Sequence, residues 1–113
     1  MKIISATLRF VQLKEMAAAS FVDMVKAVVD LDRDIIALDA ELHSDLELEL
    51  LKDGSSQASL WGINLYPDAA GEDFVEFDSM INLRPSQGNR SRSVDDAGAQ
   101  ARIRDLVARK IVR

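Results

Sequence analysis

The alternation of apolar and polar positions changes its period along the chain, and each change predicts an element. From Phe10 onward apolar residues recur every three or four positions, which predicts a helix over about 10–21. The pattern then becomes period two in the β-branched stretch "VKAVVDL", typical of a strand. The turn sequence "DRD" and the apolar "IIAL" that follow complete a predicted hairpin over about 25–39.

The remaining elements follow from caps and shorter patterns. Ser44 and Glu47 have capping-box spacing, and Gly54 is placed to end the helix that they start. Ser93 and Asp96 have similar spacing before an amphipathic stretch. The predicted elements are a strand over about 2–6, a helix over about 44–53, strands over about 60–66, 74–78 and 80–84, and a helix over about 94–111. This order predicts the α+β class: a small mixed or antiparallel sheet packed with three helices.

Two segments are distinctive enough to suggest relatives. These are "LWGINLYP" (60–67) and "FDSMINLRPSQGNRSR" (77–92). With the stretches around them, the sequence resembles a family of small bacterial domains of unknown function over nearly its whole length. The resemblance implies one compact domain over residues 1–113. It implies no activity, substrate or cofactor, so it assigns no functional residue.

Composition narrows the class of protein further. The chain has 113 residues, 48% of them hydrophobic and 29% charged, as in a soluble globular domain. It contains no cysteine, which excludes disulfides, thiolate nucleophiles and cysteine metal sites. No apolar run approaches the roughly 18 residues of a membrane span, and no signal peptide is recognisable. We therefore expect a cytoplasmic protein without a membrane partner.

The charges are distributed unevenly. Residues 1–83 contain 6 Lys and Arg against 16 Asp and Glu, a net charge of −10. Residues 84–113 contain 8 Lys and Arg against 3 Asp and Glu, a net charge of +5. This asymmetry indicates either an anionic partner for the basic end or mutual neutralisation of the two parts in the fold.

The loop before the last predicted helix carries the first candidate site. Its candidate ligand-binding side chains are Arg84, Gln87, Asn89, Arg90 and Arg92. Arginine forks match phosphate or carboxylate oxygens in pairs, and a helix N-terminus favours an anion. The alternative is that the arginines bind the protein's own carboxylates.

The second candidate site is one face of the predicted hairpin formed by 60–66 and 74–78. If Tyr66 lies opposite Phe74, Asn64 faces Glu76, and alternate residues share a face. Tyr66 and Asp78 lie on the same face of this hairpin, and Asn82 and Arg84 join it if the strand continues in phase. The resulting surface is either the floor of a polar cleft or the ordinary solvated face of a sheet.

These features support three hypotheses of function. The first is a small binding or regulatory module for an anion, such as a phosphate-bearing molecule or an acidic protein segment. The second is a metal-dependent hydrolase or nuclease that uses Glu76, Asp78 and His43, with Arg84 as anion stabiliser. The third is a structural homo-oligomer. Binding of nucleic acid has weak support because no aromatic residues interleave the basic ones. No cofactor and no dedicated metal site are predicted.

Overall fold

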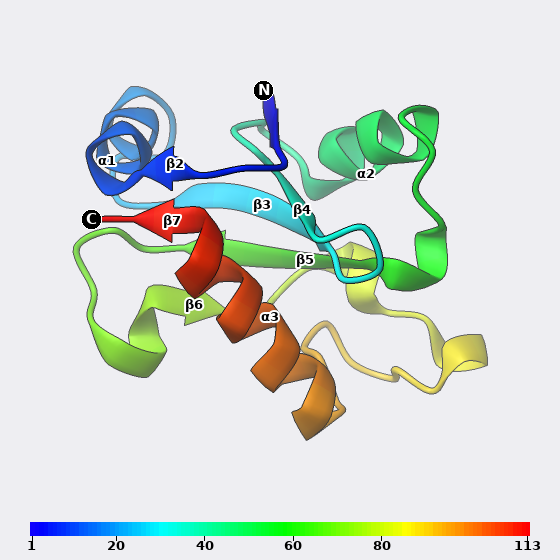
Figure 1. Ribbon diagram of the computed structural model, residues 1–113. Helices are drawn as coiled ribbons and strands as arrows, with labels where there is room; N and C mark the ends of the chain where they lie inside the picture. The colour runs from blue at the N-terminus through cyan, green and yellow to red at the C-terminus, as the bar shows by residue number, and fades with distance from the viewer.

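A five-stranded antiparallel sheet forms the centre of the computed structural model, which describes residues 1–113 (Figure 1). Its strands lie in the order β1-β4-β3-β5-β6. They are β1 (Lys2–Ile4), β3 (Val25–Asp30), β4 (Ile35–Leu38), β5 (Leu60–Leu65) and β6 (Val75–Glu76). The helices are α1 (Phe10–Ala19), α2 (His43–Lys52) and α3 (Ala97–Lys110). The predicted α+β class is confirmed.

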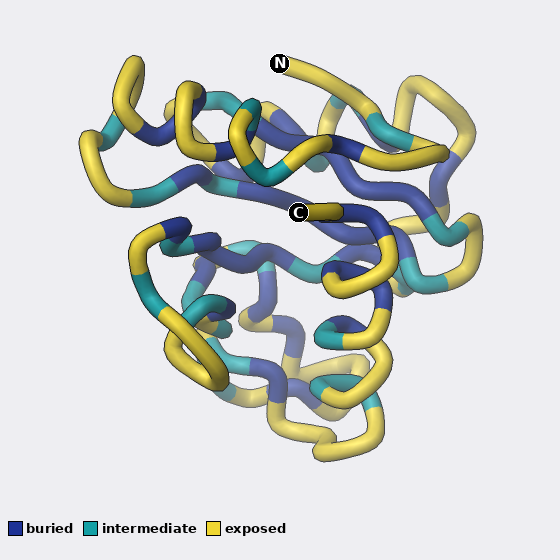
Figure 2. Tube along the Cα trace, turned by 60° about the vertical axis from the view of Figure 1, so that its left-hand side comes forward, coloured by how far each residue is buried: buried dark blue, intermediate teal, exposed yellow.

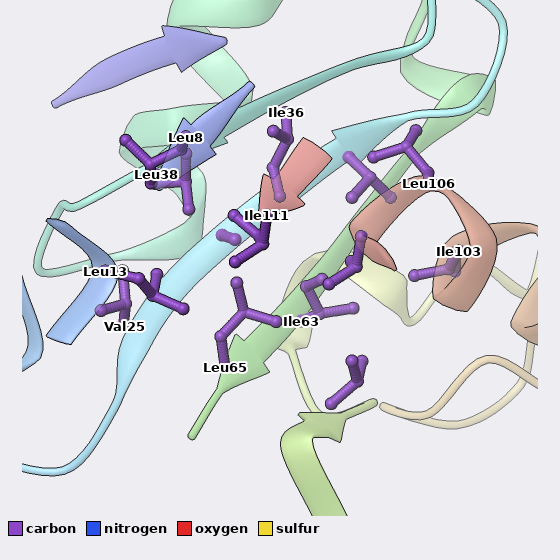
Figure 3. Packing of buried hydrophobic residues seen from close by; sticks show 14 of the residues in the cluster. Leu8, Leu13, Val25, Ile36, Leu38, Ile63, Leu65, Ile103, Leu106 and Ile111 are labelled. Atoms are coloured by element: carbon purple, nitrogen blue, oxygen red, sulfur yellow. The ribbon is translucent and has the colours of Figure 1, made fainter. Parts of the chain in front are cut away.

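The larger core lies between the sheet and the pair α1 and α3. Alternate residues of β3 and β5, among them Val25 and Ile63, point to this face and are fully buried. Leu13 of α1 and Ile103 and Leu106 of α3 pack against them (Figure 3). In Figure 2 the central strands are buried along most of their length, while the connecting loops are largely exposed. The period-two pattern of the sequence thus reflects a strand with a core on this face.

The opposite face of the sheet has a smaller core under α2. Val28, Ala37 and Leu60 point to this side and pack against Leu46 and Leu50 of the helix. Because β3 and β4 are covered on both faces, apolar residues also occupy the second phase of their alternation. Helix α2 is only 10 residues long and therefore leaves part of this face uncovered.

Helices α2 and α3 begin at residues other than those predicted from the sequence. Helix α2 begins at His43, so Ser44 lies within its first turn instead of capping it. Helix α3 begins at Ala97, and its cap is Asp96, whose carboxylate accepts a hydrogen bond from the Ala99 N–H at 2.8 Å. Ser93 lies outside the helix. A carboxylate at this position also suits the positive end of the helix dipole.

A two-stranded parallel pair near the two ends of the chain was not predicted. Strand β2 (Leu8–Arg9) pairs with β7 (Ile111–Val112), directly after the end of α3. Each strand is only two residues long, which is too short to produce a recognisable sequence pattern. The pair joins the start of α1 to the end of α3.

The prediction of a strand over 80–84 is wrong. Residues Met80–Asn82 form a turn of 3-10 helix instead. The side chain of Asn82, which is fully buried, takes the place that a neighbouring strand would fill along β5. Its Oδ1 accepts from the Gly62 N–H at 2.8 Å, and its Nδ2 donates to the Gly62 carbonyl at 2.9 Å. The amide therefore satisfies both backbone groups of Gly62 as a paired strand would.

Gly62 must lack a side chain for this arrangement. A Cβ built at Gly62 would lie 2.5 Å from Oγ and 2.6 Å from Cβ of Ser79. Ser79 in turn is held by its N–H, which donates to the Arg92 carbonyl at 3.0 Å. The glycine in "LWGINLYP" is therefore explained by close approach of the 79–82 turn to β5.

Ion pairs connect the basic end of the chain to the acidic part. Arg109 donates to both carboxylate oxygens of Asp34, at 2.9 and 2.7 Å, and Lys110 lies 3.2 Å from the same group. Asp34 is the last residue of the turn in the β3–β4 hairpin and has a positive φ of 56°. The bonds from Arg109, the largest cause, lower the pKa of Asp34 to about 2. Mutual neutralisation thus accounts for part of the charge asymmetry.

We predict that Asn82→Ala strongly destabilises the fold. The change leaves the buried N–H and C=O of Gly62 without partners, so the free energy of unfolding should fall by about 2–4 kcal/mol. Urea denaturation measures this. Gln87→Ala, in an exposed side chain of the same loop, is the control and should change it by less than about 0.5 kcal/mol. Equal stability of the two variants would show that the amide pairing contributes little.

We predict that the stabilisation from Asp34 disappears in acid. The pKa of this carboxyl is lower in the folded state, so its stabilisation is complete above about pH 4 and is lost as pH falls towards 2. Asp34→Asn tolerates the positive φ and should lower Tm by about 3–6 °C at pH 7 but hardly at pH 2. Asp39→Asn is the matched control because Asp39 also has a positive φ. A Tm deficit of Asp34→Asn that is independent of pH would contradict the prediction.

Candidate functional site

A cavity of about 500 Å³ opens on the α2 side of the sheet. It lies between the first turn of α2, the polar face of β5 and β6, and the 78–81 segment, where α2 does not cover the sheet. Its volume is in the usual range for small-ligand sites. The polar and charged lining residues are Lys26, His43, Ser44, Asn64, Tyr66, Glu76, Asp78, Ser79 and Arg92.

Asn64 is the central polar residue of the cavity floor. Its Nδ2 donates to Glu76 Oε1 at 2.8 Å and to the Asp78 carbonyl at 3.2 Å. Both partners can only accept, so the amide orientation is determined, and Oδ1 is left buried without a partner. The Tyr66 hydroxyl also donates to Glu76 Oε1, at 3.2 Å. Burial and the nearby Glu76 charge raise the pKa of Tyr66.

His43, the first residue of α2, forms part of the cavity wall. Its Nε2 lies 2.8 Å from the Ile63 carbonyl and must carry the proton that this oxygen accepts. Burial is the main cause that lowers the pKa of His43, and the Lys26 charge adds to it. The Ile63 carbonyl, Asn64 and Asp78 oppose this shift without reversing it. The imidazole is therefore neutral near pH 7, with an unprotonated Nδ1 that can accept a hydrogen bond.

Two cations complete the charge of the site. Arg92 donates from Nε to Asp78 Oδ1 at 2.8 Å, which leaves its two terminal nitrogens without hydrogen bonds. Lys26 lies on β3 directly opposite Asn64, and its ammonium is 5.4 Å from the centre of the Phe21 ring. The cavity thus contains two carboxylates and two cations, and both signs of charge are available to a ligand.

The structure brings together five of the candidate residues from the sequence. His43, Asn64, Glu76, Asp78 and Arg92 all line this cavity, although they come from α2, β5, β6, the segment after β6 and the 84–92 loop. The predicted register is also confirmed, since Asn64 pairs with Glu76.

Arg84 lies elsewhere and is used internally. Its guanidinium is buried, with the carbon atom 4.4 Å from the centre of the Trp61 ring. Nη2 donates to the Leu60 carbonyl at 2.6 Å, and Nη1 donates to the Gln57 carbonyl. Burial lowers the pKa of Arg84. Arg84 therefore binds backbone carbonyls of the protein. The alternative expected from the sequence was that it would bind internal carboxylates.

Asn89 holds the loop together from within. Its Nδ2 donates to the Asn82 carbonyl at 2.7 Å and to the Ser93 carbonyl at 2.8 Å, and its Oδ1 accepts from the Asp95 N–H at 2.8 Å. Asn82 and Asn89 thus both direct their amides to the backbone. The side chains of Gln87 and Arg90 are exposed and lie outside the cavity.

The carboxylate of Asp95 already accepts hydrogen bonds from donor groups of the loop. Asp95 accepts hydrogen bonds from the Arg90 N–H at 2.7 Å and from the Ser91 hydroxyl. These bonds, that from Ser91 first, lower the pKa of Asp95. An anion at this point of the loop would have to displace Asp95.

Sequence reasoning did not include Lys26 and Tyr66 among the site residues. Tyr66 was placed on the correct face of the hairpin, and a strand-order prediction would have added Lys26, because β3 pairs with β5 in phase. Leu42 and Met80, which are 54% and 62% exposed, form an apolar rim that only the tertiary structure creates.

The second hypothesis required a metal ion. No group of three or more His, Cys, Asp or Glu side chains is arranged to hold one. His43, Glu76 and Asp78 share the cavity without forming such a cluster. The arrangement supports hydrogen bonding and charge pairing with a ligand.

Comparison with known proteins places the chain in a family. Residues 2–110 match the model of the family described as "Protein of unknown function (DUF5674)". The chain belongs to this family. The resemblance noted from "LWGINLYP" and "FDSMINLRPSQGNRSR" agrees with it, and the match assigns no activity. No curated protein and no solved structure matches the chain. None of the helices is long and apolar enough to cross a lipid bilayer.

We predict that protonation of His43 destabilises the domain. The pKa of His43 is lower in the folded state than in the unfolded chain. The stability that depends on neutral His43 is therefore fully present above about pH 6.5 and is lost as pH falls below that value. The slope is at most about 1.4 kcal/mol per pH unit. Urea denaturation between pH 7.5 and 5 should show this decline in the wild type and a weaker one in His43→Gln, whose amide can still donate to the Ile63 carbonyl. Parallel pH profiles would contradict the prediction.

Proposed function

We propose that the domain is a small-ligand binding module whose site is the cavity around Asn64. The observation that carries the proposal is the convergence of His43, Asn64, Glu76, Asp78 and Arg92, from separate parts of the fold, on one cavity. Pockets with a few convergent polar groups are the usual form of a binding site. The ligand that fits has an anionic group, a hydrogen-bond donor such as an amine, and a short apolar part.

Three features favour binding of the ligand's anionic group at one side of the cavity. The free terminal nitrogens of Arg92 can bind two oxygens together, and the Lys26 ammonium adds a second positive charge. The first turn of α2, with His43 and Ser44, borders the same cavity and contributes the positive end of its dipole.

The cavity also offers acceptors for the hydrogen-bond donor of the ligand. Glu76 Oε1 already accepts two hydrogen bonds, whereas Oε2 accepts none, and Glu76 is exposed. Asp78 likewise uses only Oδ1 for Arg92. The unprotonated Nδ1 of His43 is a third acceptor. The apolar rim of Leu42 and Met80 can contact the body of the ligand.

The proposal moves the expected anion from the 84–92 loop to the cavity. Within that loop Arg84 and Asn89 bind the protein's own backbone, and Asp95 accepts the loop donors. Arg92 is the loop cation that lines the cavity. The enzyme hypothesis is less favoured, since Arg84 does not line the cavity that contains Glu76 and no metal-holding cluster is formed.

Thermal shift with defined small probes tests the proposal. Diglycine carries both charges, inorganic phosphate only the negative charge, and putrescine only the positive charge. We predict that 10 mM of a doubly charged probe such as diglycine raises Tm by roughly 6 °C, as expected for a dissociation constant near 1 mM. Phosphate and putrescine alone should have much smaller effects.

Matched variants separate the cavity from the loop. Glu76→Gln and Arg92→Ala should abolish the shift, whereas Arg90→Ala, in the exposed arginine of the same loop, should retain it. A shift caused by phosphate and abolished by Arg90→Ala would favour the loop as the anion site. No shift with any probe at 10 mM would reject the proposal in this form.

A further inference from the structure

A second cavity, of about 660 Å³, lies on the other side of the sheet. It is bounded by the Gly71–Phe74 turn, the start of β6, the last turns of α3 and strand β7. It shares no lining residue with the first cavity. Its apolar lining residues are Phe74, Val75, Val107, Ala108, Ile111 and Val112.

The apolar walls are continuous with the larger core. Val75, Val107 and Ile111 are buried members of that core, so the floor of the cavity is apolar. Phe74 and Ala108 form its more accessible sides. An apolar cavity of this size gains most from a ligand that excludes water from it.

Two arginines at the cavity have no carboxylate partner. Arg104 donates to the Glu72 carbonyl at 3.2 Å and lies 4.9 Å from the centre of the Phe77 ring. Arg113 lies 4.0 Å from the centre of the Phe10 ring and 5.8 Å from that of Phe74. Neither forms an ion pair, unlike Arg109 of α3, which pairs with two aspartates.

Cation–π contacts hold the two guanidinium groups without neutralising them. An aromatic ring supplies no carboxylate oxygen, so N–H groups of the guanidinium remain for the oxygen atoms of a ligand. Glu72 is the one acidic residue at the cavity, so two positive charges stand against one negative charge. The local charge is therefore positive in a protein whose net charge is −5.

We infer that this cavity binds a small carboxylate with an apolar body, such as a medium-length acyl chain. The apolar part fills the space over Val107 and Ile111, and the carboxylate pairs with Arg113 and Arg104 at the edge. A compact anion such as phosphate would leave the apolar walls in contact with water, so it fits less well. This site is independent of the cavity around Asn64.

Binding of decanoate tests the inference. Isothermal titration should give saturable binding to one site. In ¹H–¹⁵N spectra the largest shifts should fall in residues 71–75 and 107–113. Decanol, which has the same chain without the charge, should bind about tenfold more weakly because it lacks the charge-assisted hydrogen bonds. Equal affinity for decanol and decanoate would overturn the assignment of the arginines.

Two pairs of variants make the test specific. Arg113→Gln should weaken decanoate binding about tenfold, whereas Arg102→Gln, on α3 but outside the cavity, should not. Ala108→Trp places a large side chain in the cavity and should abolish binding, whereas Ala101→Trp, exposed on another part of α3, should not. Decanoate affinity that is unchanged in Ala108→Trp would overturn the site.

The outcome is separable from that of the proposed function. Glu76→Gln alters the first cavity alone, so it should leave decanoate affinity unchanged. Loss of decanoate binding in Glu76→Gln would place the ligand in the first cavity and reject the second site.

Discussion

The pairing of the Asn82 side-chain amide with the backbone of Gly62 determines how the segments around the Asn64 cavity are arranged. Strand β6 ends at Glu76, and beyond it the Asn82 amide satisfies both polar groups of Gly62. The same Nδ2 donates to the Arg92 carbonyl at 3.0 Å. Arg92 is thereby held beside Asp78, and its side chain reaches the cavity. A buried amide with all partners satisfied is a strong positional constraint.

Much of the sheet could be predicted because its signals are local. The alternation in 25–31 and 60–66 identifies β3 and β5. Placing Tyr66 opposite Phe74 at the end of the hairpin gives the register that pairs Asn64 with Glu76. The 80–84 segment has the same alternation, yet it is not a strand, because a side chain can satisfy a strand edge as well as a backbone can. A hydrophobic pattern does not distinguish these cases.

The candidate site was predicted where it depended on strand phase and missed where it depended on tertiary packing. Asn64, Glu76 and Asp78 follow from one face of one hairpin. Arg84 is in a cationic loop, and its chemistry alone resembles that of a ligand-binding residue. Only the position of Trp61 and of two backbone carbonyls explains why it is buried in the structure. The contribution of Lys26 depends on the order of strands, which composition does not encode.

The parallel pair β2–β7 has a consequence for the order of assembly. Leu8 and Ile111 are among the most distant partners in the chain, so the entropy cost of closing the intervening loop is paid before their hydrogen bonds form. All residues that line the cavity on the α2 side of the sheet come before residue 93. They are therefore synthesised before β7, which closes the pair with β2. The cavity beside β7 therefore has its full lining only after residue 113 has been made.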